Sequence, residues 1–282
     1  MGDRANYAVL RDGALGLYEA HWGASRLTVE LLPGPDAATA LFTGRAPADR
    51  WLDDVAGQGG ALVDHDRRRL LYHAVDAGGY AGRAAVREVL RRTWPGWRID
   101  WAWDGQGDLA DAAGQDRAAI RSDAPPLELW PSYDQEHWIN CLVTVTDGGK
   151  TRAYAIDTDF ADVLGRGVGL IDELADWPTV EHCASLPESG VHFDVAERAA
   201  GFWTVQPLCG RHEQMAARRP DWTWSMWNDR YTEQLARTDH AVTCPEPDMA
   251  RAYATLRERA ARLTRAEHRV LEAIDELAAN AS

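Results

Sequence analysis

The order of secondary-structure signals constrains the fold of this chain most strongly, because the same order occurs twice. The first half shows hairpin patterns over residues 5–22 and 60–75, a helical pattern over 80–93 and an alternating aromatic strand over 97–103. The second half shows hairpins over 141–157 and 190–205, a short helix over 211–219 and an aromatic strand over 222–227. A repeated order of this kind indicates an internal duplication.

Matched residues support the duplication. Trp97 and Trp222 are separated by the same number of residues as Asp104 and Asp229, so the two pairs align together. Gly60 aligns with Gly190 in the hairpin before them. Each helix is followed by a Pro-x-Trp sequence, and proline ends a helix. Identity between the halves is low, and chance alignment of two α+β segments is the alternative. We predict an α+β fold with mainly antiparallel sheets in two related halves, with helices on one face.

Boundaries between the parts follow from composition. Residues 112–135 contain Pro125-Pro126 and Trp130-Pro131 and have poor periodicity, as is typical of a linker. We therefore expect a first half over 1–115, a second half over 136–240 and C-terminal helices over 241–282. Thr264 and Glu267 form a capping box, and an apolar stripe follows it. We expect this stripe to pack on the body of the protein, and a homodimer contact is the alternative.

Charge and cysteine usage exclude several classes of partner. The net charge is −14 with a pI of about 5.0, so a basic surface for nucleic acid or anionic membrane is not expected. No apolar stretch is long enough to span a membrane, and no secretory signal is visible. The four cysteines contain no CxxC pair, which favours a reduced, cytoplasmic protein whose cysteines mostly pack in the interior. We therefore expect a soluble protein of 282 residues.

The first hairpin carries the strongest functional signal. Asp12-Gly13 between two apolar runs predicts a two-residue type I′ turn. This turn fixes the register, with the pairs Asn6–Glu19, Arg4–His21 and Asp3–Trp22 toward the open end. Because side chains alternate along a strand, one face carries leucines near the turn and then the polar residues Asn6, Glu19, Arg4 and His21.

This polar patch suits acid–base chemistry. His21 beside Glu19 predicts a general acid or base, with Glu19 orienting the imidazole. Arg4 could hold an acidic group of a substrate in bidentate fashion. We expect the substrate to be bound by Asp3, Arg4, Asn6, Trp22 and Trp103. The structural alternative is an ion network at the end of a sheet, because most such clusters have no catalytic role.

The ends of this hairpin also carry a resemblance. Gly2–Asn6 (GDRAN) opening the first strand and His21–Gly23 (HWG) closing the second resemble a group of uncharacterised bacterial and phage proteins. The sequence WPGW at 94–97 is similar to actinobacterial members of that group. The resemblance implies no activity, cofactor or site residue.

Other motifs point to structure rather than chemistry. The sequence DGGKT at 147–151 lacks the first glycine of a phosphate-binding loop and lies in a hairpin turn. Asp157, Asp159 and Asp162 could hold Mg²⁺ or Ca²⁺, but aspartates at a strand end more often cap a helix. The pairs Asp64–Asp66 and His192–Asp194, with His73, His182 and Cys183, match no zinc spacing. We therefore predict no metal site, and the sequence indicates no cofactor.

Two functions remain open at this stage. The first is an enzyme that acts on a small molecule or short peptide at the hairpin, with strand tryptophans as pocket walls. The alternative is a non-catalytic binding protein of immunity or inhibitor type, whose acidic or aromatic surface meets a protein partner. An enzyme requires a concave pocket at the polar end of the first hairpin, whereas a binder requires only an exposed patch.

Overall fold

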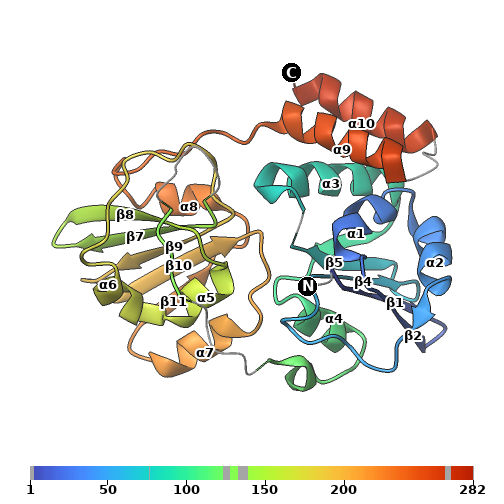
Figure 1. Cartoon of the computed structure of the whole chain (residues 1–282), viewed down its shortest axis with the longest axis horizontal. Helices are drawn as coiled ribbons and strands as arrows, with labels where there is room; N and C mark the ends of the chain where they lie inside the picture. The colour runs from blue at the N-terminus through green and yellow to red at the C-terminus, as the bar shows by residue number, and fades with distance from the viewer. Residues whose placement is uncertain (1–2, 76, 123–127, 133–138, 264–267, 282) are drawn as a thin grey trace. The chain divides into compact units, whose positions relative to one another are not determined.

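The computed structural model describes residues 3–75, 77–122, 128–132, 139–263 and 268–281. The chain divides into two compact units (Figure 1). Unit 1 comprises residues 1–123 and 248–282, and unit 2 comprises residues 124–247. Helices α9 (Met249–Leu263) and α10 (His268–Ala281) therefore belong to unit 1 although they follow unit 2 in the chain. No described helix has both the length and the apolar character needed to cross a membrane.

Unit 1 contains a six-stranded sheet with the order β3-β2-β1-β4-β5-β6. Its strands are β1 (Ala5–Arg11), β2 (Ala14–Ala20), β3 (Ala46–Pro47), β4 (Gly59–Asp64), β5 (Arg69–Ala74) and β6 (Arg98–Trp101). Its other helices are α1 (Ala24–Leu31), α2 (Pro35–Thr43), α3 (Gly79–Thr93), α4 (Gln106–Ala112) and the 3₁₀ helix η1 (Arg117–Ile120).

Unit 2 repeats this arrangement in a five-stranded sheet with the order β11-β10-β9-β7-β8. Its strands are β7 (Cys141–Asp147), β8 (Lys150–Ile156), β9 (Ser189–Asp194), β10 (Ala199–Thr204) and β11 (Thr223–Met226). Its helices are α5 (Phe160–Gly165), α6 (Leu170–Glu173), α7 (Arg211–Arg218) and α8 (Tyr231–Leu235), with the 3₁₀ helix η2 (Gly167–Gly169).

The registers of the two sheets agree residue by residue. Ala5 of β1 pairs with Gly59 of β4 in parallel, and Cys141 of β7 pairs with Ser189 of β9 in parallel. The strands β5–β6 and β10–β11 are parallel in the same way. The predicted α+β class with two related halves is thus confirmed. The prediction of mainly antiparallel sheets holds only in part, because each antiparallel hairpin joins its neighbours through parallel pairs.

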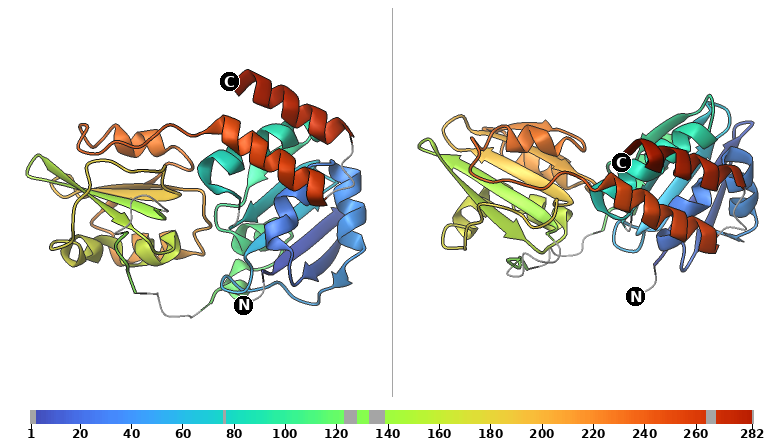
Figure 2. Two further views of the ribbon diagram at one scale, coloured as in Figure 1. Left: turned by 45° about the horizontal axis from the view of Figure 1, so that its top comes forward. Right: turned by 90° about the horizontal axis from the view of Figure 1, so that it is seen from above.

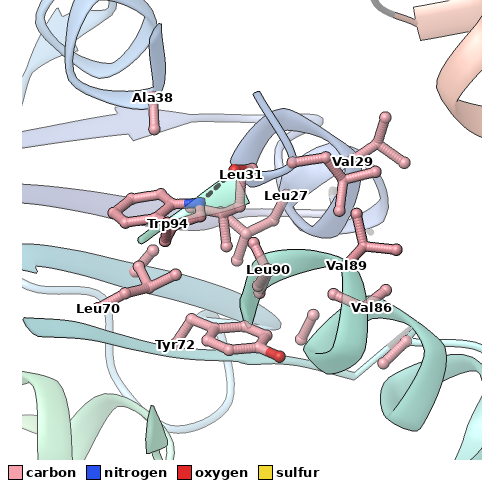
Figure 3. Packing of buried hydrophobic residues seen from close by; sticks show 14 of the residues in the cluster. Leu27, Val29, Leu31, Ala38, Leu70, Tyr72, Val86, Val89, Leu90 and Trp94 are labelled. Atoms are coloured by element: carbon pink, nitrogen blue, oxygen red, sulfur yellow. Dashed lines mark hydrogen bonds between the residues drawn. The ribbon is translucent and has the colours of Figure 1, made fainter. Parts of the chain in front are cut away.

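The main core of unit 1 lies between one face of the sheet and helices α1, α2 and α3. Alternate residues of β1, β4 and β5 point into it, as the period of a strand requires. Trp94, just after α3, is fully buried there, and its indole N–H donates to the carbonyl of Leu31 at 2.8 Å (Figure 3). This bond satisfies the one polar atom of a large apolar side chain.

Helices α9 and α10 form an outer layer over α1 and α3 (Figure 2). Val270 and Ile274 are buried in the main core of unit 1, so the apolar stripe of α10 contacts its own chain. Arg259 of α9 donates to the carbonyl of Ser25, and Arg92 of α3 bonds Glu276 of α10 at 2.6 Å. The predicted capping residues Thr264 and Glu267 lie outside the described residues.

The other face of the unit 1 sheet carries a smaller core, covered by α4. Its buried residues are Ala8, Leu62, Leu71, Ala102 and Leu109. Leu10, Leu15 and Leu17 of the first hairpin and Trp51 pack against it. Helices therefore cover both faces of this sheet, where the sequence predicts them on one face only. By register, the candidate residues Asn6 and Glu19 belong to the face under α4.

Candidate functional site

The turn of the first hairpin has the predicted geometry. Asp12 and Gly13 both have left-handed φ values, 53° and 72°, as a type I′ turn requires. The pairing runs from Arg11↔Ala14 to Ala5↔Ala20 and includes Asn6↔Glu19, so the predicted register is confirmed over these residues. The predicted pairs Arg4–His21 and Asp3–Trp22 are not found, because β1 begins at Ala5 and β2 ends at Ala20. The carboxylate of Asp66 accepts the backbone N–H groups of Asp12 at 2.7 Å and Gly13 at 2.9 Å. These two bonds lower the pKa of Asp66 below its usual value.

Asp3 supports the first helix. Its carbonyl accepts the N–H of Gly23 at 2.8 Å, and its carboxylate accepts the N–H of Ser25 at 2.7 Å. These are orphan donors at the start of α1, and no side chain of the N-cap residue Gly23 satisfies them. The contacts seen at Asp3 are therefore those of a helix cap, where the sequence predicts substrate binding.

Asn6 joins the hairpin to a distant loop. Its side chain is fully buried, and its amide oxygen accepts the N–H of Leu52 at 2.7 Å. Its amide nitrogen lies 3.4 Å from the carbonyl of Tyr18, to which it donates. Asn6 therefore fixes the segment 48–56 beside the hairpin. A ligand reaches no polar atom of Asn6, but the segment it holds forms a wall of the hollow described below.

The remaining hairpin candidates, Arg4, Glu19, His21 and Trp22, are all exposed. The His21 and Trp22 rings meet edge to face at 5.2 Å, and Trp22 is 64% exposed. Among the residues that the structure describes, no hydrogen bond or ion pair joins Arg4, Glu19 and His21 to one another. Arg4 and His21 lie just beyond the last pair of the hairpin, Ala5↔Ala20, and the side chains of Arg4, Glu19 and His21 do not form one network.

A hollow of about 700 Å³ lies on the same face of the sheet. We call it the hairpin hollow, and its lining includes Arg4, Leu15, Leu17, Trp51, Asp53 and Ile120. Its size lies within the range of small-ligand pockets, roughly 300–1,000 Å³. The leucines of the hairpin supply an apolar floor, Trp51 comes from the loop that Asn6 holds, and Ile120 comes from η1.

Charged side chains around the hairpin hollow differ in whether they already have hydrogen-bond partners. The Asp53 carboxylate accepts the N–H groups of Val55 and Ala56, and the Asp116 carboxylate accepts the N–H of Ala118. Arg4, by contrast, bonds no other side chain in the described parts of the chain. The side chain of Arg4 is therefore available to an acidic group of a ligand.

An ion network around two buried carboxylates borders the hairpin hollow. Arg121 binds the carboxylates of both Asp54 and Asp104, and Arg117 donates to Asp104 at 3.0 Å. Burial raises the pKa of Asp54 to about 6, although Arg121 opposes this shift. The network fixes the loop 48–56 and η1 to α4, and these segments form the walls of the hollow.

Trp103 lies at a second hollow, of about 480 Å³, beside β6. The strand predicted over 97–103 ends at Trp101, and Trp103 follows it with the guanidinium of Arg83 4.7 Å from its ring centroid. The second hollow is lined by charged residues, Arg69, Arg98, Asp100, Asp108 and Asp111, together with Trp101. Trp103 is not in the lining of the hairpin hollow, so the predicted grouping of Trp103 with the hairpin residues is not found.

The alternative metal candidates make ordinary structural contacts. Asp157 accepts a hydrogen bond from Asn140 at 3.0 Å, and Asp159 occupies the N-cap position of α5 without a capping bond from its side chain. Burial and the neighbouring carboxylates of Asp162 and Asp157 raise the pKa of Asp159. His192 is bonded to the hydroxyl of Thr144 at 2.9 Å. Within the described residues, no three histidine, cysteine or acidic side chains are grouped so that they could hold a metal ion.

Sequence reasoning missed Trp51, the loop 48–56 and the Arg121 network. The stretch DRWLDD at 49–54 mixes one tryptophan with four charges, which is a weak sign of a functional loop. Nothing in the sequence pairs Arg121 with Asp54. No family model, curated protein or solved structure matches the chain.

Proposed function

We propose that the protein binds a small molecule or short peptide in the hairpin hollow, with Arg4 holding an acidic group of the ligand. One observation carries the proposal. An exposed arginine without a side-chain partner stands beside leucines and a tryptophan on the wall of a ligand-sized hollow. A ligand that combines an apolar group with a carboxylate suits this lining, because arginine binds carboxylates in bidentate fashion.

The geometry supports binding more directly than acid–base catalysis. A general base must lie within hydrogen-bond reach of the group it deprotonates. The lining of the hairpin hollow includes no histidine, and neither Glu19 nor His21 contributes to it. We therefore assign a binding role to Arg4 and the leucines and no chemical step to the hollow.

Chemical-shift titration with simple probes tests this proposal. We expect N-acetyl-leucine and N-acetyl-tryptophan to shift the backbone resonances of Leu15, Leu17 and Trp51. The corresponding carboxamides should bind at least about tenfold more weakly, because a hydrogen bond to a charged group contributes about 1.5–3 kcal/mol.

Variants separate the hollow from the rest of the surface. Arg4→Gln should remove the preference for the carboxylate, and Ala119→Trp should fill the hollow and abolish the shifts, since Ala119 is an exposed lining residue. Arg251→Gln is the matched control, because Arg251 is an exposed arginine of unit 1 outside the hollow. Equal binding of acids and amides, or loss of binding in the Arg251 variant, would contradict the proposal.

A further inference from the structure

Two of the four cysteines lie side by side in unit 2. His182 and Thr243 form a parallel β-bridge, in which the N–H of Thr243 donates to the carbonyl of Glu181 at 3.0 Å. The N–H of Cys183 donates to the carbonyl of Thr243 at 2.9 Å. Cys183 and Cys244 follow the bridged residues, so they lie opposite each other on the two segments. Both side chains pack in the same apolar cluster.

This placement fits the requirements of a disulfide. Neighbouring strands lie about 4.7–4.9 Å apart, which falls within the 4.4–6.8 Å range of Cα separations in disulfides. Opposite residues on neighbouring strands direct their side chains to the same face. Cys183 and Cys244 also pack in one apolar cluster, which places the two side chains beside each other. Bond formation therefore requires little backbone movement.

We propose that Cys183 and Cys244 form a reversible disulfide, which makes this pair an oxidative modification site of unit 2. Two thiols lose two electrons and two protons to a disulfide oxidant such as oxidised glutathione, which becomes two molecules of the reduced thiol. In the first exchange, a cysteine thiolate attacks the oxidant and releases one glutathione. The second cysteine then attacks the mixed disulfide and releases the other.

The surroundings of the pair favour this chemistry. Cys183 is 6% exposed in an apolar cluster with Val180 and Val242, whereas Cys244 is half-buried at the rim of that cluster. An oxidant can therefore reach one sulfur while the other is positioned beside it. The neighbouring Cys244 lowers the pKa of Cys183, whereas the pKa of Cys244 itself is raised, so Cys183 is the thiolate of the pair and Cys244 its more accessible neighbour.

The other two cysteines provide an internal comparison. Cys141 is fully buried, and burial raises its pKa to about 12, so its thiol is unreactive near neutral pH. Cys209 lies before α7, and its thiol is 3.9 Å from the carbonyl of Pro207. Cys209 is half-buried like Cys244 and lies outside the bridged segments that hold Cys183 and Cys244, so it is the matched control.

A disulfide between these residues would enclose β9, β10, β11, α7 and α8 in one covalent loop. Closing a loop of this length restricts the unfolded chain strongly, so the oxidised unit should be more stable than the reduced one. The cross-link also fixes the position of Cys244, which lies just before the point where the chain leaves unit 2.

The test is to equilibrate the full chain with oxidised glutathione and to count thiols in denaturant. We expect four thiols before oxidation and two afterwards, a mass lower by two hydrogen atoms, and one cross-linked peptide pair containing Cys183 and Cys244. The midpoint of thermal unfolding of unit 2 should rise by several degrees, and dithiothreitol should reverse every change.

Variants make the result specific. Cys209→Ser should still lose two thiols and gain thermal stability, whereas Cys244→Ser should keep its three thiols and gain none. A wild-type chain that retains four thiols, or that forms only intermolecular or Cys209-linked disulfides, would overturn the proposal. The wild-type measurement decides the question even if Cys244→Ser folds poorly.

Discussion

His73 and Trp203 occupy the same position in the two units, but only Trp203 has a hydrogen-bond partner there. His73 pairs with Gly60 across β4 and β5, and Trp203 pairs with Gly190 across β9 and β10. The indole of Trp203 donates to Gln234 at 2.7 Å, whereas neither ring nitrogen of His73 has a partner in the described structure. The repeated unit thus serves as an internal reference for each buried polar group.

We predict that His73 makes the stability of the protein depend on pH. Burial lowers the pKa of His73 from 6.5 to about 4, so the unfolded state binds more protons between these values. Stability is therefore fully present above pH 6.5 and falls as the pH drops toward 4, by about 3 kcal/mol in total for this group. Urea unfolding measured at half-unit steps of pH should show this slope.

The variant His73→Leu should reduce that slope. It should also be at least as stable as the wild type at pH 7, because it removes two buried nitrogens that lack partners. His192, whose pKa burial also lowers to about 4, should keep part of the pH dependence. His21→Gln, at an exposed position, is the matched control. An unaltered profile in His73→Leu would contradict the prediction.

A second prediction concerns a large–small exchange between the units. Leu71 and Ala102 of unit 1 correspond to Gly201 and Trp227 of unit 2. The N–H of Ala102 donates to the carbonyl of Tyr72, which follows Leu71. In the same way, the N–H of Trp227 donates to the carbonyl of Phe202, which follows Gly201. A Cβ atom at Gly201 would lie only 1.8 Å from the Trp227 ring, so the indole fills the space that Leu71 fills in unit 1. Gly201→Leu alone should therefore prevent normal packing.

A compensating double variant tests whether the two positions share one space. Trp227→Ala should cost about 3–5 kcal/mol by leaving a cavity. The double variant Gly201→Leu/Trp227→Ala copies the unit 1 pair and should recover a large part of that loss. Chemical denaturation of the three variants gives the coupling energy, and additive losses would show that the two positions do not share one space.

The fold was largely predictable because its signals are local. Asp12-Gly13 requires two left-handed residues, and that requirement alone sets the register of the first hairpin. The parallel pairing of β1 with β4 was not predictable, because it depends on how α1 and α2 carry the chain back across the sheet. Hydrophobic alternation identifies strands but does not order them.

The candidate site was predictable only in part, for a similar reason. The face of the hairpin and the place of Arg4 at its open end follow from register. The hollow itself depends on Asn6 binding the N–H of Leu52 and on Arg121 joining Asp54 to Asp104, and these residues are far apart in sequence. Such long-range polar contacts leave no periodic pattern, so the register alone predicts Asn6 as a ligand contact, whereas its side chain holds Leu52.

A third prediction concerns Gln234, which replaces Leu109 of the first unit. Its amide accepts from Trp203 and donates to the carbonyls of Leu142 and Val191, all within a buried site. Gln234→Leu should cost about 1–3 kcal/mol, because it leaves the indole N–H of Trp203 buried without an acceptor. When Trp203→Phe is added to Gln234→Leu, the double variant should lose less stability than the sum of the two single losses, as measured by urea unfolding. Strictly additive losses would contradict this.

The last prediction is that Arg121 stabilises unit 1 by pairing two buried carboxylates. The side chains of Asp54 and Asp104 are 6% and 3% exposed, and Arg121 binds both. Arg121→Met leaves Asp54 without its cation and should cost about 3–5 kcal/mol at pH 7. The loss should shrink as the pH falls, because a carboxyl whose pKa is already raised to about 6 takes up a proton and no longer needs the cation.

Two further variants test this account of Arg121. Arg117→Met should cost less, because Asp104 keeps its bond to Arg121 and the other partners of Arg117, Asp108 and Asp111, are more exposed. Asp54→Asn introduced into the Arg121→Met chain should restore part of the stability at pH 7, since it removes the uncompensated charge. Urea unfolding at pH 7 and pH 5 measures both effects. A loss in Arg121→Met that is the same at both pH values would mean that the arginine acts through packing alone.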